Sequence, residues 1–114
     1  MRSAAQTPLI LIADDSEMNR AMLVEMLESE YDIIEAENGE EAVEQLRLHG
    51  PEFSLVLLDI VMPKLDGFDV LEEMNRNRWI EGIPVIMITS ETTASRIERA
   101  FEMGATDFIS RPFD

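Results

Sequence analysis

The chain has 114 residues, of which 46% are hydrophobic, so it is long enough to form one domain with its own core. It has no cysteine, which excludes disulfides, thiolate metal sites and cysteine nucleophiles. Its 24 acidic and 9 basic residues give a net charge of -15, which disfavours direct binding to nucleic acid or to anionic membranes.

The N-terminal segment lacks the apolar core of a signal peptide, and residues 1–7 are expected to form a flexible lead-in. No apolar stretch in the chain approaches the roughly 20 residues that a membrane helix needs. A soluble cytoplasmic protein is therefore expected, with residues 8–114 as its single domain.

Apolar runs and segments of helical period alternate along the rest of the chain. Leu9–Ala13 is continuously apolar, which is typical of a strand buried on both faces. Ser16 is a suitable cap for the next helix, in which Met18, Met22 and Met26, with Leu23 and Leu27, recur at helical spacing. The three methionines are expected to pack inside the protein. The full pattern predicts strands over residues 9–13, 31–37, 54–60, 83–88 and 107–110, and helices over about residues 17–29, 40–49, 68–77 and 93–103.

This alternation of strands and helices predicts a parallel sheet with helices on both faces. In such sheets, ligands bind beyond the carboxyl ends of the strands, where the strand order reverses. Polar residues stand at or just past the ends of the predicted strands, namely Asp14, Asp15, Asp59, Thr89 and Arg111. The sequence therefore predicts a polar site at one edge of the sheet.

The residue types at this edge indicate the chemistry of the site. Clustered carboxylates raise one another's pKa, and a bound cation removes that penalty. Oxygen ligands without histidine or cysteine favour Mg²⁺, Mn²⁺ or Ca²⁺ over zinc or copper. A carboxylate can also attack phosphorus, and Asp59 is the best candidate because it stands alone at its strand end, which leaves Asp14 and Asp15 to hold the metal. Thr89 and Arg111 could then bind phosphoryl oxygens.

Several groups of residues extend this pattern, and they follow one another in the order Asp14-Asp15, Leu58-Asp59-Ile60-Val61-Met62-Pro63 with Asp66-Gly67, Ile88-Thr89-Ser90, Gly104-Ala105-Thr106-Asp107-Phe108 and Arg111-Pro112-Phe113. Each group alone is a weak indication. Together they resemble the receiver domain of two-component response regulators over about residues 8–114. The resemblance implies an α/β fold of the flavodoxin-like type, which is a doubly wound, five-stranded parallel sheet with strand order 2-1-3-4-5.

The resemblance also implies how the site is phosphorylated. Asp59 is the phosphoacceptor, which takes a phosphoryl group from the phosphohistidine of a histidine kinase or phosphotransfer protein. The cofactor is Mg²⁺, for which Mn²⁺ can substitute. Asp15 binds the ion directly and Asp14 binds it through water, while Asp59 and the backbone carbonyl of Val61 complete the protein ligands. The chain is then a signalling phosphoacceptor rather than an enzyme that acts on external substrates.

The response to phosphorylation is implied in the same way. Thr89 and Phe108 form the switch, and Val61 and Glu91 tune the lifetime of the phosphoaspartate. Arg111 stands where the family usually has a lysine. Arginine keeps the charge but is longer and planar, so the exchange is not conservative. We still expect Arg111 to contact the phosphoryl group.

The family's fifth helix has no counterpart in this sequence, which ends at Asp114. That helix normally covers one sheet face beside the first helix, so apolar surface is expected to be exposed there unless the native chain continues or a partner covers it. The partners that the resemblance allows, besides the kinase, are a second copy in a homodimer and an effector domain in a longer native protein.

Two other functions remain open at this stage. A degenerate receiver would serve as a phosphorylation-independent interaction module, and Arg111 in place of lysine keeps this alternative open. An aspartyl-nucleophile phosphohydrolase would use the same acidic site. Such enzymes commonly carry a second acid two residues after the nucleophile, and this chain has Val61 there, which argues against turnover.

Overall fold

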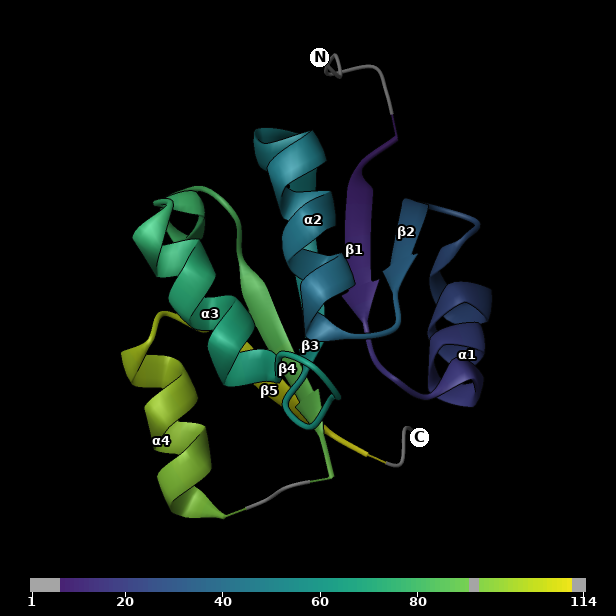
Figure 1. The fold of residues 1–114 in the computed structure, drawn as a ribbon. Coiled ribbons are helices and arrows are strands. Elements are labelled where there is room, and N and C mark those ends of the chain that lie inside the picture. The colour runs from purple at the N-terminus through teal and green to yellow at the C-terminus, as the bar shows by residue number, and fades with distance from the viewer. Residues whose placement is uncertain (1–6, 91–92, 112–114) are drawn as a thin grey trace.

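The computed structural model describes residues 7–90 and 93–111, which form a parallel sheet with helices on both faces (Figure 1). Its strand order is β2-β1-β3-β4-β5, as predicted. The strands are β1 (Leu9–Ala13), β2 (Asp32–Ala36), β3 (Phe53–Asp59), β4 (Val85–Thr89) and β5 (Asp107–Ser110). The helices are α1 (Glu17–Leu27), α2 (Gly39–His49), α3 (Gly67–Arg76) and α4 (Ala94–Glu102), with 3-10 turns η1 (Gly50–Glu52) and η2 (Trp79–Glu81).

Strand side chains alternate between two cores because successive residues of a strand point to opposite faces of the sheet. On one face, Leu11 and Val56 belong to a core that α2, α3 and α4 complete. On the other face, Ile12 and Leu57 pack with Leu23 of α1. The central strands are therefore apolar on both sides, which is why their sequences are continuous apolar runs.

The crossover connections determine where a site can form. α1 links β1 to β2 in one direction across the sheet, whereas α2, α3 and α4 link the later strands in the opposite direction. Because these crossovers are right-handed, α1 lies on one face and the other helices lie on the opposite face (Figure 1). The direction reverses between β1 and β3, which opens a crevice beyond the carboxyl ends of these strands.

The element boundaries follow local chemistry. The Ser16 side chain caps α1, as predicted, and Asp66 and Asp69 form a reciprocal capping box at the start of α3. β4 begins at Val85 rather than at residue 83, because Pro84 has no N–H to donate to the strand ladder. The capping box thus defines where α3 begins, at the end of the loop that follows β3.

The methionines of α1 correct one prediction. Met18, Met22 and Met26 are 73%, 38% and 58% exposed, so the expectation that they pack inside the protein is wrong. Helical spacing shows that residues share a face, but it does not say which face meets the sheet. Leu23 and Leu27, which belong to the same predicted set, do pack against the sheet.

The sheet face beside α1 remains partly open. Leu27, Tyr31, Leu55, Ile86 and Ile109 contribute to the lining of an apolar groove of about 720 Å³. This agrees with the expected exposure of apolar surface beside the first helix. Across residues 7–90 and 93–111, no helix has the length and apolar character needed to cross a membrane.

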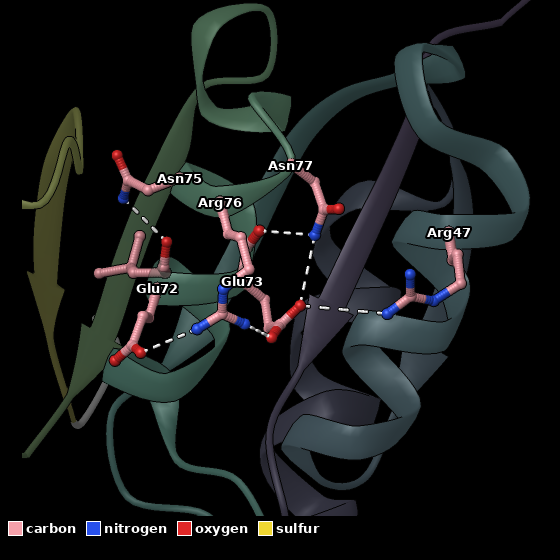
Figure 2. Close-up of polar contacts among 7 residues, drawn as sticks. Arg47, Glu72, Glu73, Asn75, Arg76 and Asn77 are labelled. Atoms are coloured by element: carbon pink, nitrogen blue, oxygen red, sulfur yellow. Dashed lines mark hydrogen bonds and ion pairs between the residues drawn. The ribbon is translucent and has the colours of Figure 1, made fainter.

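Polar contacts join α3 to its neighbours at the end of the helix far from the carboxyl edge of the sheet. The Glu73 carboxylate accepts hydrogen bonds from Arg76 and Asn77 and pairs with Arg47 of α2 at 4.0 Å (Figure 2). Asn75 Nδ2 donates to the carbonyl of the residue that follows α4, at 2.7 Å. Exposed pairs of this kind contribute little individually, and they leave the carboxyl edge of the sheet unobstructed.

Candidate functional site

Asp14, Asp59 and Thr89 meet at one edge of the sheet because their strands end there. Asp14 directly follows β1, and Asp59 and Thr89 are the last residues of β3 and β4. The register pairs the end of β1 with the penultimate residue of β3, and the end of β3 with the penultimate residue of β4. Each of the three residues is 1% exposed, so the strand ends bury these polar groups rather than presenting them to solvent.

Three carboxylates form a cluster at this edge. Asp14, Asp15 and Asp59 each offer an oxygen that lies within 4.8 Å of the oxygens offered by the other two. Asp14 and Asp59 are buried, whereas Asp15 is exposed at the mouth of the cluster. The sequence prediction that these residues converge is therefore correct in its geometry.

Burial makes the ionised forms of the two inner carboxyls costly. It raises the pKa of Asp59 from its ordinary value of 3.8 to about 7, and the charge of Asp14 adds to this rise. Arg111 and the Val61 N–H lower the pKa of Asp59, but they do not compensate. Burial also raises the pKa of Asp14, against the opposing hydrogen bond from the Ser16 N–H. A second positive charge in the pocket would favour the ionised form of both groups.

Arg111 is the cation that faces the cluster. Its Nη1 donates to Asp14 Oδ2 at 3.4 Å and its Nη2 donates to Asp59 Oδ1 at 3.3 Å. The side chain is 17% exposed, and the Arg111 backbone N–H donates to the Thr89 carbonyl at 3.0 Å as the chain leaves β5. The planar guanidinium therefore bridges two carboxylates, one with each terminal nitrogen.

One carboxylate oxygen of the cluster is an unsatisfied hydrogen-bond acceptor. Asp59 Oδ2 is buried and has no hydrogen-bond partner among the residues that the structure describes. Buried polar atoms are nearly always satisfied, so a water, an ion or another ligand is expected to bond this oxygen. Three carboxylates without histidine or cysteine are oxygen ligands of the kind that Mg²⁺ and Mn²⁺ accept, and the residues present therefore fit such an ion.

The loop between β3 and α3 folds back against the Asp59 backbone. Gly67 N donates to the Ile60 carbonyl at 2.8 Å, and a Cβ on Gly67 would lie 2.4 Å from the Asp59 carbonyl oxygen. Only glycine permits this approach. The Val61 N–H donates to the Asp59 carboxylate, and Val61 as a whole is 57% exposed.

Sequence reasoning missed the residues that hold Asp14. Arg20 Nη1 donates to the Asp14 carbonyl at 2.7 Å, and the Ser16 N–H donates to Asp14 Oδ1 at 2.8 Å. The Asn19 side chain also hydrogen-bonds the Asp14 carboxylate. The available signal was that Asn19 and Arg20 lie in the first turns of a helix that begins immediately after two acids.

The other predicted residues lie around this centre. Phe108 on β5 is half-buried, packs against the larger core and contacts Phe101 edge to face, with a centroid distance of 6.4 Å. Ser90 follows β4 and is exposed. Glu91, predicted to tune phosphoaspartate lifetime, lies outside the described residues.

Comparison with known proteins gives relatives that share this sequence pattern. The profile of the response regulator receiver domain matches residues 10–114. The chemotaxis protein CheY of Halobacterium salinarum is 41% identical over 105 residues, which are 91% of this chain and 84% of that protein. A probable cyclic di-GMP phosphodiesterase of Vibrio cholerae is 39% identical over 103 residues, which are 90% of this chain but only 23% of that protein.

Solved structures agree in fold. In the CheX–CheY–BeF3–Mg complex of Borrelia burgdorferi, a chain with 34% identity superposes with a TM-score of 0.86, covering 94% of this chain and 80% of that chain. A CheY-like receiver domain of Methanospirillum hungatei has 26% identity and a TM-score of 0.85, covering 96% of this chain and 85% of that chain.

Proposed function

This chain belongs to the response regulator receiver domain family, and from that premise we propose that it is a signalling phosphoacceptor modified on Asp59. The donor is the phosphohistidine of a histidine kinase or of a phosphotransfer protein. The observation that carries the proposal is the buried Asp59 Oδ2, which has no hydrogen-bond partner in the described structure and lies beside two further carboxylates. We also propose that the protein works in the cytoplasm, where such donors are found.

The proposed reaction is an in-line displacement at phosphorus. An oxygen of the Asp59 carboxylate forms the new bond to phosphorus, the bond from phosphorus to the histidine nitrogen breaks, and that nitrogen keeps the electron pair. Attack requires the ionised form of Asp59, whose pKa is raised to about 7 by burial. At neutral pH the carboxyl is therefore poised between its two forms.

The acidic cluster supplies the ligands for the proposed cofactor. Asp14, Asp15, Asp59 and the backbone carbonyl of Val61 would hold Mg²⁺, whose charge offsets the negative charge that gathers on the phosphoryl oxygens. Mn²⁺ suits the same oxygen ligands. The fit of three clustered carboxylates to a hard cation supports this assignment.

Arg111 and Thr89 are assigned to the phosphoryl group itself. Arg111 Nη2 bonds the Asp59 carboxylate, and we expect it to contact the phosphoryl group when that carboxylate becomes an acyl phosphate. Thr89 ends the neighbouring strand and would donate its hydroxyl to another phosphoryl oxygen. We propose that this new contact, with rotation of Phe108, shifts the population towards an active state. Val61, beside the pocket mouth, would tune the lifetime of the product together with Glu91.

We propose that the donor approaches the pocket past the start of α1, which begins two residues after Asp15. Met18 and Met22 are exposed on that helix, and Met18 follows Asp15 by three residues in the sequence. Flexible, polarisable methionine side chains are suited to contact with a helical partner. A donor that docks here would present its phosphohistidine to Asp59. A homodimer and an attached effector domain remain proposals for the output.

Labelling with acetyl phosphate and Mg²⁺ tests the proposal. We expect a mass gain of one phosphoryl group per chain, which is absent in Asp59→Asn and absent when EDTA is added. Glu44→Asn, an exposed acid on α2, serves as the control and should be labelled like the wild type. A phosphorylated phosphotransfer protein used as donor then tests the phosphohistidine source.

The alternatives give different results in the same experiment. Continuous release of phosphate from phosphate esters, without a stable adduct, would indicate a phosphohydrolase. No labelling and no change on adding beryllofluoride would indicate an interaction module. Either result would refute the proposal that Asp59 carries a stable signalling phosphoryl group.

A further inference from the structure

We propose that Arg20 and Glu35 together form a brace that positions Asp14 and Asp15 for cation binding. Neither residue belongs to the cluster of three carboxylates. The inference rests on the proposed function, because it concerns the site that would hold Mg²⁺.

The brace consists of two hydrogen bonds from one guanidinium. Arg20 Nη1 donates to the Asp14 carbonyl at 2.7 Å, and Arg20 Nε donates to Glu35 Oε1 at 3.1 Å. The Arg20 side chain is 11% exposed, whereas that of Glu35 is 47% exposed. Arg20 is thus held between the loop after β1 and the neighbouring strand β2. A planar guanidinium can bond two acceptors in fixed directions, which a lysine ammonium cannot do as well.

The position of the accepting carbonyl explains why the brace matters. The Asp14 carbonyl belongs to the peptide unit between Asp14 and Asp15, and a planar peptide carries the Cα atoms of both residues. Holding this carbonyl therefore holds the direction in which both side chains leave the backbone. The Asp14 N–H is held as well, since it donates to the Ala36 carbonyl of β2 at 3.1 Å.

Asp15 depends most on this arrangement. It is exposed, and no residue that the structure describes donates a hydrogen bond to its carboxylate. Its position is therefore set by the backbone rather than by contacts of its own. Asp14, in contrast, is also fixed through its side chain by the Ser16 N–H at 2.8 Å. Arg20 and Glu35 are positioning residues that act on the cation through the peptide between the two acids.

Isothermal titration of MgCl2 into metal-free protein tests the brace directly. Arg20→Lys keeps the positive charge but loses the planar guanidinium that bonds two acceptors at once. We expect this variant to bind Mg²⁺ about tenfold more weakly, which is usual when a residue that orients a metal ligand is lost. Glu35→Ala should have a similar effect. The matched control is Glu37→Ala, which removes the same charge from an exposed residue two positions away that does not bond Arg20.

Two further measurements separate positioning from general stability. The melting temperature of each variant in EDTA reports on the fold, and we expect Arg20→Lys to remain folded at the titration temperature. Labelling by acetyl phosphate at saturating Mg²⁺ should return to within about twofold of the wild-type rate, because the brace acts on cation affinity and not on the reacting atoms.

The titration distinguishes failure of the proposed function from failure of the brace alone. Wild-type protein that does not bind Mg²⁺ would overturn the proposed function and this inference with it. Wild-type protein that binds Mg²⁺ while Arg20→Lys and Glu35→Ala bind it equally well would overturn the brace alone. The brace is also refuted if Glu35→Ala and Glu37→Ala weaken Mg²⁺ binding to the same degree, since that result reports only the lost charge.

Discussion

Replacement of Asp59 by asparagine should stabilise the metal-free protein, and the gain should depend on pH. Asp59 is 1% exposed, and burial with the charge of Asp14 raises its pKa from 3.8 to about 7. Because the folded state holds this proton more tightly than the unfolded state does, the carboxyl contributes no penalty well below pH 4. The penalty grows as the pH rises from about 4 to about 7 and is complete above pH 7.

The size of the effect follows from that shift. A change from 3.8 to about 7 corresponds to about 4 kcal/mol of unfolding free energy at pH 8. Asparagine has nearly the same shape and no charge to desolvate, so Asp59→Asn should recover much of this amount. The variant leaves Arg111 with one carboxylate partner instead of two, which reduces the gain. We therefore expect a net stabilisation on the order of 2–4 kcal/mol at pH 8 and close to none at pH 4.

Urea unfolding in EDTA at pH 4, 6 and 8 measures the difference between variant and wild type. Comparison at each pH cancels the titration of the acids outside the cluster, which both proteins share. Glu44→Gln, an exposed acid on α2, is the control for loss of one negative charge from a chain of net charge -15. The conclusion that ionisation of the buried Asp59 carboxyl destabilises the folded protein would be refuted by either of two results. One is a stability difference that is constant across this pH range, and the other is a variant less stable than the wild type at pH 8.

Three further predictions concern the surroundings of Asp59. Arg111→Ala should slow labelling by acetyl phosphate about tenfold or more at saturating Mg²⁺, since a charge-assisted hydrogen bond is lost, and an unchanged rate would exclude Arg111 from the phosphoryl site. Gly67→Ala should lower the unfolding free energy by at least about 1 kcal/mol in urea, because its Cβ would meet the Asp59 carbonyl oxygen. Thr89→Ala should still be labelled but should lose the NMR shift change of Phe108 on adding beryllofluoride, and a retained change would remove Thr89 from the switch.

Much of this architecture could be predicted because it depends on short-range patterns. Continuous apolar runs fixed the central strands, and Ser16 marked the start of α1. Parallel strands place their carboxyl ends at one edge, so Asp14 and Asp59 had to converge once the strand order was correct. The cluster therefore followed from topology rather than from any single motif.

Other features depend on directions that a linear pattern does not contain. Helical spacing grouped the three methionines of α1 with Leu23 and Leu27, but it did not say that the leucines would face the sheet while the methionines stayed exposed. The bond from Arg20 to the Asp14 carbonyl depends on the path of the loop, which side-chain types do not specify. Such contacts between a side chain and a backbone carbonyl leave little trace in composition or period.

The acidic pocket is a source of instability in the metal-free protein, and the same property favours cation binding. An ion that binds only the folded protein stabilises it by about 2.7 kcal/mol when its concentration is a hundred times its dissociation constant. Asp59→Asn removes one charged ligand and should gain much less from Mg²⁺. At pH 8 the stability advantage of the variant should therefore narrow by up to about 2.7 kcal/mol as Mg²⁺ is added. If Mg²⁺ does not change the difference in unfolding free energy between Asp59→Asn and the wild type, then the buried Asp59 carboxylate is not a ligand of the proposed metal site.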